Sequence, residues 1–145
     1  MKIILAADHA GFELKEKIKQ NLLKRSIGVK DFGAMSYNSS DDYPDFILPA
    51  AKFLSKNTDY LGIILGGSGQ GEAIAANRVN GIRAVVYYGG SLEIIKLSRM
   101  HNNANILSLG ARFVNEKNIM KVIDLWLNTD FEGDRHLRRI KKLDI

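Results

Sequence analysis

Residues 60–78, YLGIILGGSGQGEAIAANR, place an unbroken apolar run in front of a glycine-rich loop and a helix-forming segment. The run Tyr60–Leu65 shows no alternation of polar and apolar side chains, which is typical of a strand buried on both faces of a parallel sheet. The loop Gly66–Gly71 follows directly, and Glu72–Arg78 is predicted to form a short helix. A strand, a glycine loop and a helix in this order predict an α/β fold.

The same alternation extends in both directions from this stretch. Short apolar runs predict strands, and longer segments with an apolar residue every three or four positions predict helices between them. The predicted strands are Lys2–Ala7, Gly28–Phe32, Tyr60–Leu65, Ile82–Tyr87 and Asn105–Leu109. The predicted helices are Gly11–Arg25, Pro44–Lys56, Glu72–Arg78, Ser91–Arg99 and Glu116–Leu127, followed by a tail that is helical or extended. We therefore expect residues 1–145 to form a single domain with a doubly wound, Rossmann-like, five-stranded parallel sheet and helices on both faces.

The composition excludes several kinds of chemistry. The 145 residues contain no cysteine, which excludes disulfides, zinc–thiolate sites and thiol nucleophiles. No stretch approaches the roughly 18 consecutive apolar residues of a membrane helix. The amino-terminal segment is only briefly apolar and lacks a signal-peptide cleavage site. These features predict a cytoplasmic protein that does not bind membranes.

The net charge of +5 is distributed unevenly. Residues 134–145 carry +3, because five basic residues stand against two acidic ones: Arg135, Arg138, Arg139, Lys141 and Lys142 against Asp134 and Asp144. A basic segment of this kind attracts an anion, whether phosphate, nucleic acid or acidic protein. Nucleic acid is the least favoured of these, because the segment lacks interleaved aromatic residues and a broad basic face.

Polar and charged residues follow the predicted strands. Asp8 and His9 come after the first strand, the glycine loop with Glu72 after the third, and Arg112 after the fifth. Ligands of open α/β sheets bind outside the carboxyl ends of the strands. We therefore expect these residues to gather at one edge of the sheet, together with His101 and the basic tail.

Each of these features also has a purely structural interpretation. Asp8 is a suitable helix cap, and the glycine loop can be a tight turn between strand and helix. Glu72 can be an ordinary surface residue, and His101 can gain from the dipole at the end of its helix. An arginine-rich tail can be a solvated face.

The glycine loop itself favours an anion over a nucleotide. Successive backbone N–H groups in such a loop form an anion-binding nest. The loop lacks the Gly-Lys-Ser/Thr ending of a phosphate loop. A dinucleotide loop follows the first strand of the sheet rather than the third, so a Rossmann-type dehydrogenase is not expected.

Several segments together resemble the ribose-5-phosphate isomerase B family, which includes allose-6-phosphate and galactose-6-phosphate isomerases. The resemblance extends in order along essentially the whole chain, through Asp8–Gly11, Asp42–Pro44, Gly66–Arg78, Gly81–Ala84, His101–Asn105, Leu109–Arg112 and Arg135–Arg139. It implies an aldose–ketose isomerase that interconverts ribose 5-phosphate and ribulose 5-phosphate through a cis-enediolate, without metal or other cofactor.

The resemblance also implies roles for individual residues. One branch of the family uses a Cys base at the position of Gly66, and the other uses a Glu after the last loop glycine, so this chain resembles the Glu branch with Glu72 as base. Ser68 and the loop amides would hold the oxyanion, and His101 with Asp8 would open the furanose ring. The implied substrate-binding residues are His9, Tyr43, Gly67, Gly69, Gly71, Asn102, Arg112, Arg135, His136 and Arg139, with Arg138 a further candidate for the phosphate.

In that family His101, Asn102 and Arg112 come from a neighbouring subunit, so the resemblance implies a homodimer or homotetramer with shared sites. Residues 134–145 are expected to contribute to the site or to the dimer. Two other functions stay open on the residues alone: an isomerase of a six-carbon sugar phosphate, such as allose 6-phosphate or galactose 6-phosphate, and a non-catalytic sugar-phosphate-binding protein. The depth of the pocket, and the effect of Gly66 on it, would decide between substrates.

Overall fold

A computed structural model describes residues 1–144. The strands are β1 (Lys2–Ala7), β2 (Gly28–Asp31), β3 (Tyr60–Gly66), β4 (Ala84–Tyr87) and β5 (Ile106–Gly110). The helices are α1 (His9–Lys24), α2 (Pro44–Lys56), α3 (Gln70–Asn77), α4 (Leu92–Met100), α5 (Glu116–Leu127) and α6 (Asp134–Ile140). The strands form one sheet in the order β2-β1-β3-β5-β4, and every neighbouring pair is parallel.

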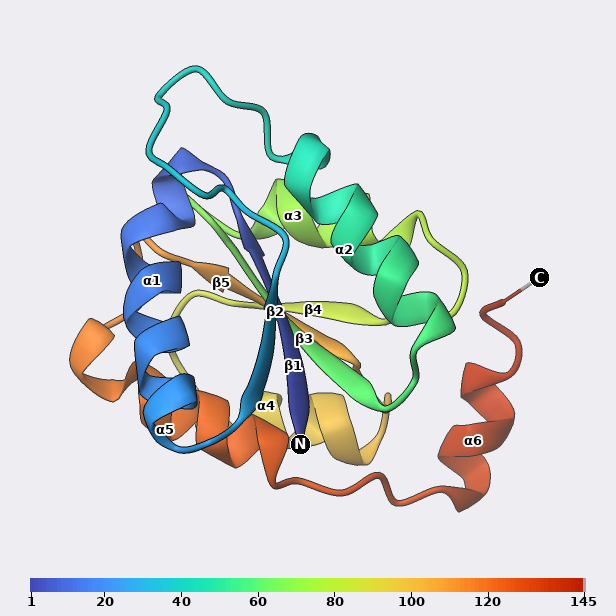
Figure 1. Ribbon diagram of the computed structural model, residues 1–145. Coiled ribbons are helices and arrows are strands. Elements are labelled where there is room, and N and C mark those ends of the chain that lie inside the picture. Colours follow the sequence, from blue (N-terminus) through green and yellow to red (C-terminus); the bar gives the residue numbers. More distant parts are fainter. Residues whose placement is uncertain (145) are drawn as a thin grey trace.

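Helices cover the sheet on both faces, as the continuous apolar strands predicted (Figure 1). On one face Leu14 and Ile18 of α1 and Trp126 of α5 pack with strand residues such as Ile3, and α4 joins the same apolar cluster. On the other face α2 and α3 pack against alternate strand residues such as Ile64. The central strands β1, β3 and β5 therefore bury both of their sides, which confirms the doubly wound sheet.

The tail forms a short helix outside these two layers. Figure 1 shows α6 beside the body of the molecule, on the side where β1 begins. Its buried residues are His136 and Ile140, while its arginines are exposed. Within residues 1–144, none of the helices is both long and apolar enough to cross a membrane.

Several element boundaries differ from the predicted ones for identifiable reasons. Helix α1 begins at His9 rather than Gly11, because the carboxylate of Asp8 caps it. Helix α3 begins at Gln70, directly after Gly69, which adopts a left-handed conformation with φ of +77°. Both shifts move backbone N–H groups of a first helical turn towards the strand ends, where an anion can reach them.

The pairing of β1 with β3 brings two distant segments together. Ala7 pairs with Leu65, so Asp8 and the glycine loop leave the sheet side by side. The strand order reverses between β1 and β3: β2 is added on one side of β1, and the later strands are added on the other side, with β5 next to β3. Gly11 lets α1 approach closely, because a Cβ there would lie 2.6 Å from the Cβ of Leu65. This is the switch point at which open α/β sheets bind ligands.

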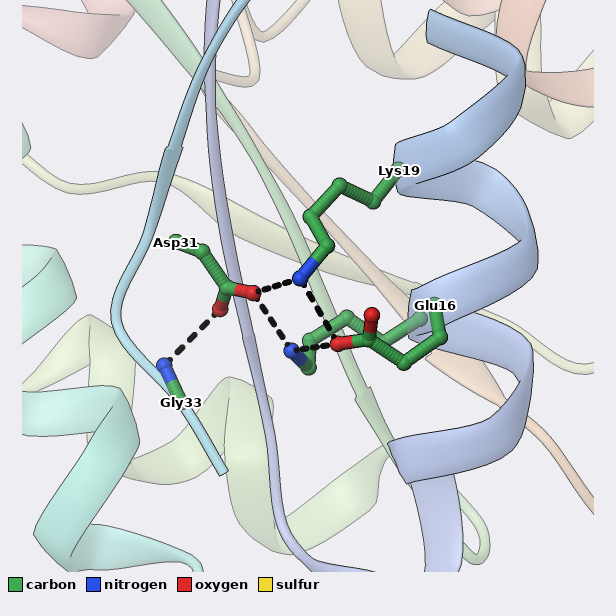
Figure 2. A network of polar contacts seen from close by, with 5 residues as sticks. Glu16, Lys19, Asp31 and Gly33 are labelled. Atoms are coloured by element: carbon green, nitrogen blue, oxygen red, sulfur yellow. Dashed lines mark hydrogen bonds and ion pairs between the residues drawn. The ribbon is translucent and has the colours of Figure 1, made fainter. Parts of the chain in front are cut away.

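A buried ion network fixes β2 and α1 at this edge. The Lys15 side chain is fully buried, and its Nζ donates to Asp31 Oδ2 at 2.7 Å and to Glu16 Oε1 at 2.8 Å. Lys19 Nζ contacts the same two carboxylates, and Asp31 Oδ1 accepts from the backbone N–H of Gly33 at 2.9 Å (Figure 2). Burial by itself would raise the pKa of Asp31, but the two lysine hydrogen bonds and the Gly33 amide outweigh it and hold the pKa below its usual value.

Replacing Lys15 tests how much this network contributes to the free energy of unfolding. Lys15→Met keeps most of the side-chain volume but leaves Asp31 with one lysine, and we expect the free energy of unfolding to fall by about 3 kcal/mol. The matched control is Lys17→Met, because Lys17 pairs with Glu116 at 2.8 Å on the exposed side of α1. The control should cost less than about 1 kcal/mol. Urea denaturation of the two variants at neutral pH makes the comparison, and equal losses would show that the burial of Lys15 adds nothing.

Candidate active site

The Asp8 carboxylate serves as a helix cap and faces the glycine loop at the same time. Its Oδ1 accepts hydrogen bonds from the N–H groups of Ala10 at 3.0 Å and Gly11 at 3.3 Å. The residue is 8% exposed, and its charge contributes to the environment of Glu72. The structural and the functional interpretations of Asp8 are therefore compatible, because the cap leaves Oδ2 free of a hydrogen bond to the helix.

Glu72 lies in the first turn of α3, and its carboxylate lies next to Gly66 at the end of β3. It is 4% exposed, so it is not the ordinary surface residue that the sequence also allowed. Burial raises its pKa, and the nearby charge of Asp8 raises it further, against the opposing effect of the backbone N–H of Glu72 itself. A carboxyl with a raised pKa exchanges protons more readily near neutral pH than an exposed one does.

Gly66 makes room for this carboxylate. A Cβ built on Gly66 would overlap the carboxyl group of Glu72. No side chain fits at position 66 unless Glu72 moves out of its place. The geometry thus gives a physical reason why a base at the position of Gly66 and a base at Glu72 exclude each other.

The glycine loop is anchored to the neighbouring strand. Ser108 Oγ, fully buried in β5, donates to the carbonyl of Gly69 at 2.6 Å. The hydroxyl of Ser68 is exposed and accepts from the N–H of Gln70 at 3.3 Å. The amides that follow in the first turn of α3 have no acceptor within the helix. The loop therefore presents a hydroxyl and free backbone donors next to Glu72.

Tyr43, His9 and Arg112 complete this group. A Cβ on Gly71 would lie 3.0 Å from the Tyr43 hydroxyl oxygen, which places the phenol against the loop. Arg112 donates its backbone N–H to Gly67 O at 3.1 Å, and its guanidinium lies beside the same glycine. His9 stands in the first turn of α1, with Nδ1 2.6 Å from Asp41 Oδ1.

A second group of predicted residues lies elsewhere. Helix α4 runs back from β4 to the start of β5, so His101 and Asn102 at its end lie where the strands begin. The ring of His101 stacks on that of His136, with centroids 4.2 Å apart and planes 11° apart. Burial lowers the pKa of His136, and the charges of His101 and Arg135 lower it further. Arg135 and Arg139 belong to the same short helix.

The expectation of one common edge is therefore wrong for the second group. Within one chain, His101, Asn102 and the α6 residues are separated from Glu72 by the length of a strand, about 15 Å. The resemblance assigned Arg112 to the neighbouring subunit, whereas within one chain its guanidinium lies beside its own Gly67. The division of the site residues between subunits stays a prediction. In this chain His101 stacks on His136 of α6, and the same helix carries Arg135 and Arg139.

Two clusters bring three possible metal ligands within 4.8 Å of one another: Asp8–His9–Asp41 and His101–Glu132–His136. In the first, the short His9–Asp41 contact is a hydrogen bond, which uses the nitrogen that a metal would need. In the second, the two imidazoles are stacked and nearly parallel, so their lone pairs run side by side rather than towards one ion. Neither arrangement fits a metal without rearrangement.

Sequence reasoning missed two acidic residues that contact predicted site residues. Asp41 hydrogen-bonds His9, although the two are 32 positions apart. Glu132 lies 3.8 Å from His101 and 3.5 Å from His136. For Asp41 the proximity to Tyr43 in the chain was a usable signal. For Glu132 no local pattern distinguishes it from other exposed acids.

The raised pKa of Glu72 predicts a pH-dependent cost to stability. A folded-state pKa above the unfolded one means that the folded state loses stability as the pH rises from the unfolded value, about 4.3, through the folded value. Glu72→Gln removes the ionisation, so this variant should be more stable than the wild type at pH 8 and show less of this advantage near pH 4. Thermal unfolding of both proteins at the two pH values measures the difference. A variant that is less stable at pH 8 would contradict the unfavourable environment of the carboxylate.

Comparisons with known proteins identify the family of this chain. A family model described as Ribose/Galactose Isomerase matches residues 3–143. Ribose-5-phosphate isomerase B of Mycolicibacterium paratuberculosis is 42% identical over 141 residues, which cover 97% of this chain and 87% of the relative. A probable ribose-5-phosphate isomerase B of Mycoplasma genitalium is 41% identical over 142 residues, covering 97% and 92%.

Solved structures agree as well. The crystal structure of ribose-5-phosphate isomerase B from Mycoplasma genitalium with bound ribulose-5-phosphate has a TM-score of 0.92 at 40% identity, covering 98% of this chain and 93% of that one. The corresponding enzyme from Thermotoga maritima has a TM-score of 0.91 at 45% identity, covering 99% and 97%. The chain therefore belongs to the ribose/galactose isomerase family.

Proposed function

We propose that this protein is an aldose–ketose isomerase that interconverts ribose 5-phosphate and ribulose 5-phosphate, with Glu72 as the base. The observation that carries the proposal is the buried Glu72 carboxyl, with its raised pKa, beside the glycine loop. The relatives named ribose-5-phosphate isomerase B and the related structure with bound ribulose-5-phosphate support the choice of substrate. The cytoplasmic location stays a prediction.

The chemistry moves protons only. Glu72 takes the proton from C2 of the open-chain aldose, which gives a cis-enediolate, and returns a proton to C1 of the ketose. A second proton passes from the oxygen on C2 to the oxygen on C1. No electrons leave the substrate, so the reaction requires no redox partner. A general base of this kind contributes about 10²–10⁴ in rate.

The developing oxyanion needs donors on the other side of the reacting carbons. The Ser68 hydroxyl and the amides around Gly69 and Gly71 surround the position next to Glu72, and one such donor contributes up to about 10³ in rate. Gly67 allows the substrate to approach the loop backbone. We expect Tyr43 to bind a hydroxyl of the open chain, and His9 and Arg112 to bind the phosphate.

The remaining functions require a second copy of the chain. The residues proposed to open the ring and orient the hydroxyls, His101 and Asn102, lie a strand length from Glu72 of the same chain. In a homodimer, one chain would supply the glycine-loop half of the site, and its partner would supply His101, Asn102, Arg135, His136 and Arg139. Asp8 would then meet His101 across the interface during ring opening.

Exposed apolar side chains near the glycine loop favour such an assembly. Tyr88 is 56% exposed and Phe113 65% exposed, and both line a pocket of about 220 Å³ with Ser68 and Gln70. Ile74 on α3 is also exposed. Another pocket, about 380 Å³, is lined by Asn102 and lies at the opposite edge. Large apolar side chains left uncovered beside an incomplete site are typical of a surface that a partner covers.

Glu72→Gln tests the base directly. The variant keeps the shape of the side chain but cannot accept a proton, so we expect kcat for ribose 5-phosphate to fall by about 10²–10⁴ while substrate affinity stays close to that of the wild type. The assay contains a chelator so that metal ions cannot contribute. Retained kcat in the variant would reject Glu72 as the base.

The same assay decides between substrates. The family description includes galactose isomerases, so allose 6-phosphate and galactose 6-phosphate are tested in parallel. Faster turnover of a six-carbon substrate would move the proposal to that sugar. Binding without turnover of any of them would support a non-catalytic sugar-phosphate-binding protein.

Mixing two inactive variants tests the shared site. Glu72→Gln and His101→Ala chains are each expected to form inactive homodimers, whereas a mixed dimer contains one site with both residues intact. Random reassociation makes about half of the dimers mixed, each with one intact site, so the mixture should recover about one quarter of the wild-type turnover. No recovery, with mixed dimers demonstrated by mass spectrometry, would place His101 and Glu72 of each site on the same chain.

A further inference from the structure

Asp41 holds His9 through two hydrogen bonds from one carboxylate oxygen. Its Oδ1 accepts from the His9 backbone N–H at 3.0 Å and lies 2.6 Å from His9 Nδ1. Only 9% of the Asp41 side chain is exposed. Asp41 comes from the loop between β2 and α2, whereas His9 begins α1, so the contact joins two separate segments at the site.

The other oxygen of this carboxylate is left without a partner. Asp41 Oδ2 is buried and has no hydrogen bond among the described residues. A buried carboxylate in this state is costly, and such exceptions in a folded protein call for an explanation. Within residues 1–144, this carboxylate has no side-chain hydrogen bonds other than the two with His9. Their value is therefore better sought in function than in stability.

The direction of the hydrogen bond determines what His9 can offer to a ligand. Nδ1 must carry the proton when it faces a carboxylate, which leaves Nε2 as the nitrogen available to the site. A neutral ring in this tautomer presents an acceptor at Nε2, which repels a phosphate oxygen. Only the imidazolium donates from both nitrogens, so the ring binds a phosphate oxygen at Nε2 in that form.

The surroundings of the ring are consistent with this role. Asp8 Oδ2 lies 4.0 Å from His9 Nδ1, which adds a second negative charge on the same side. The ring of Tyr37 meets the imidazole edge-on, with centroids 6.1 Å apart. Asp8 on one side, and Tyr37 and Asp41 of the β2–α2 loop on the other, thus restrict the orientation of the imidazole.

We propose that Asp41 is a positioning residue that fixes the His9 ring through Nδ1 and orients Nε2 towards the phosphate of the substrate. This inference rests on the proposed function, because it assigns the phosphate as the ligand of His9. Asp41 itself does not touch the substrate. Asp41 would contact the Nδ1 side of the His9 ring, and the phosphate would bind at Nε2.

The test compares Asp41→Asn with Asp42→Asn. Asparagine at position 41 can still accept from Nδ1 but carries no charge, and Asp42 is an exposed neighbour with the same side chain and no side-chain hydrogen bond to His9. Asp41→Asn should raise KM for the sugar phosphate, and the inhibition constant of inorganic phosphate, by about tenfold, with kcat changed little. Asp42→Asn should leave both constants at the wild-type values.

A spectroscopic measurement separates positioning from a general effect on the fold. The chain has only three histidines, so the ring ¹⁵N shifts of His9 can be assigned by NMR with His9→Gln. Asp41→Asn, which alters the partner of Nδ1, should change the His9 nitrogen shifts and leave those of His101 and His136 unchanged. Unchanged His9 shifts, or a fall in kcat with KM unaltered, would overturn the proposal.

Failure of the proposed function would give other results than failure of the role of Asp41. If the wild-type protein turns over none of the sugar phosphates, the isomerase assignment fails, but the His9 shifts and the phosphate affinity of the two variants can still be compared. If Asp41→Asn unfolds, Asp41→Glu provides the same comparison with the charge retained, and wild-type His9 shifts and phosphate affinity are then expected. Loss of both in Asp41→Glu would overturn the role of the charge.

Discussion

The burial of Glu72 beneath a glycine is the contact on which the candidate site depends. The carboxylate occupies the space that a Cβ at position 66 would fill, at the point where β3 ends and the loop turns into α3. Burial there raises its pKa, and the first amides of α3 have no acceptor within the helix. The proposed base and its complementary donors would therefore arise from one local feature of the backbone, the absence of a side chain at the strand end.

The sheet supplies the second constraint, because it decides which segments meet. Parallel pairing of β1 with β3 sets Asp8 beside the glycine loop, and pairing of β3 with β5 sets Arg112 beside Gly67. The same topology sends His101 to the opposite edge, since a helix that joins parallel strands must end where the next strand begins. The proposed site, which uses both groups, would therefore draw them from two chains.

Several polar residues at this edge combine a structural and a chemical role. Asp8 caps α1 and faces Glu72. The network of Lys15 with Asp31 holds the end of β2, and Asp31 in turn accepts from Gly33, whose carbonyl accepts from Ala7 next to Asp8. Charges buried in this way are expensive unless each finds a partner. Their placement around the strand ends keeps the backbone of the site rigid without apolar packing there.

The sequence by itself determined the fold class, the strand and helix segments and the residues that follow β1, β3 and β5, because these depend on local apolar periodicity and on glycine. Glu72 and Ser68 could be named for the same reason, since loop and base are contiguous. Tertiary structure alone decided that a Cβ at Gly66 would displace Glu72, that Asp41 holds His9 and that His101 lies far from Glu72 within a chain. These facts depend on strand order and on side-chain packing between segments distant in sequence, which no local pattern encodes.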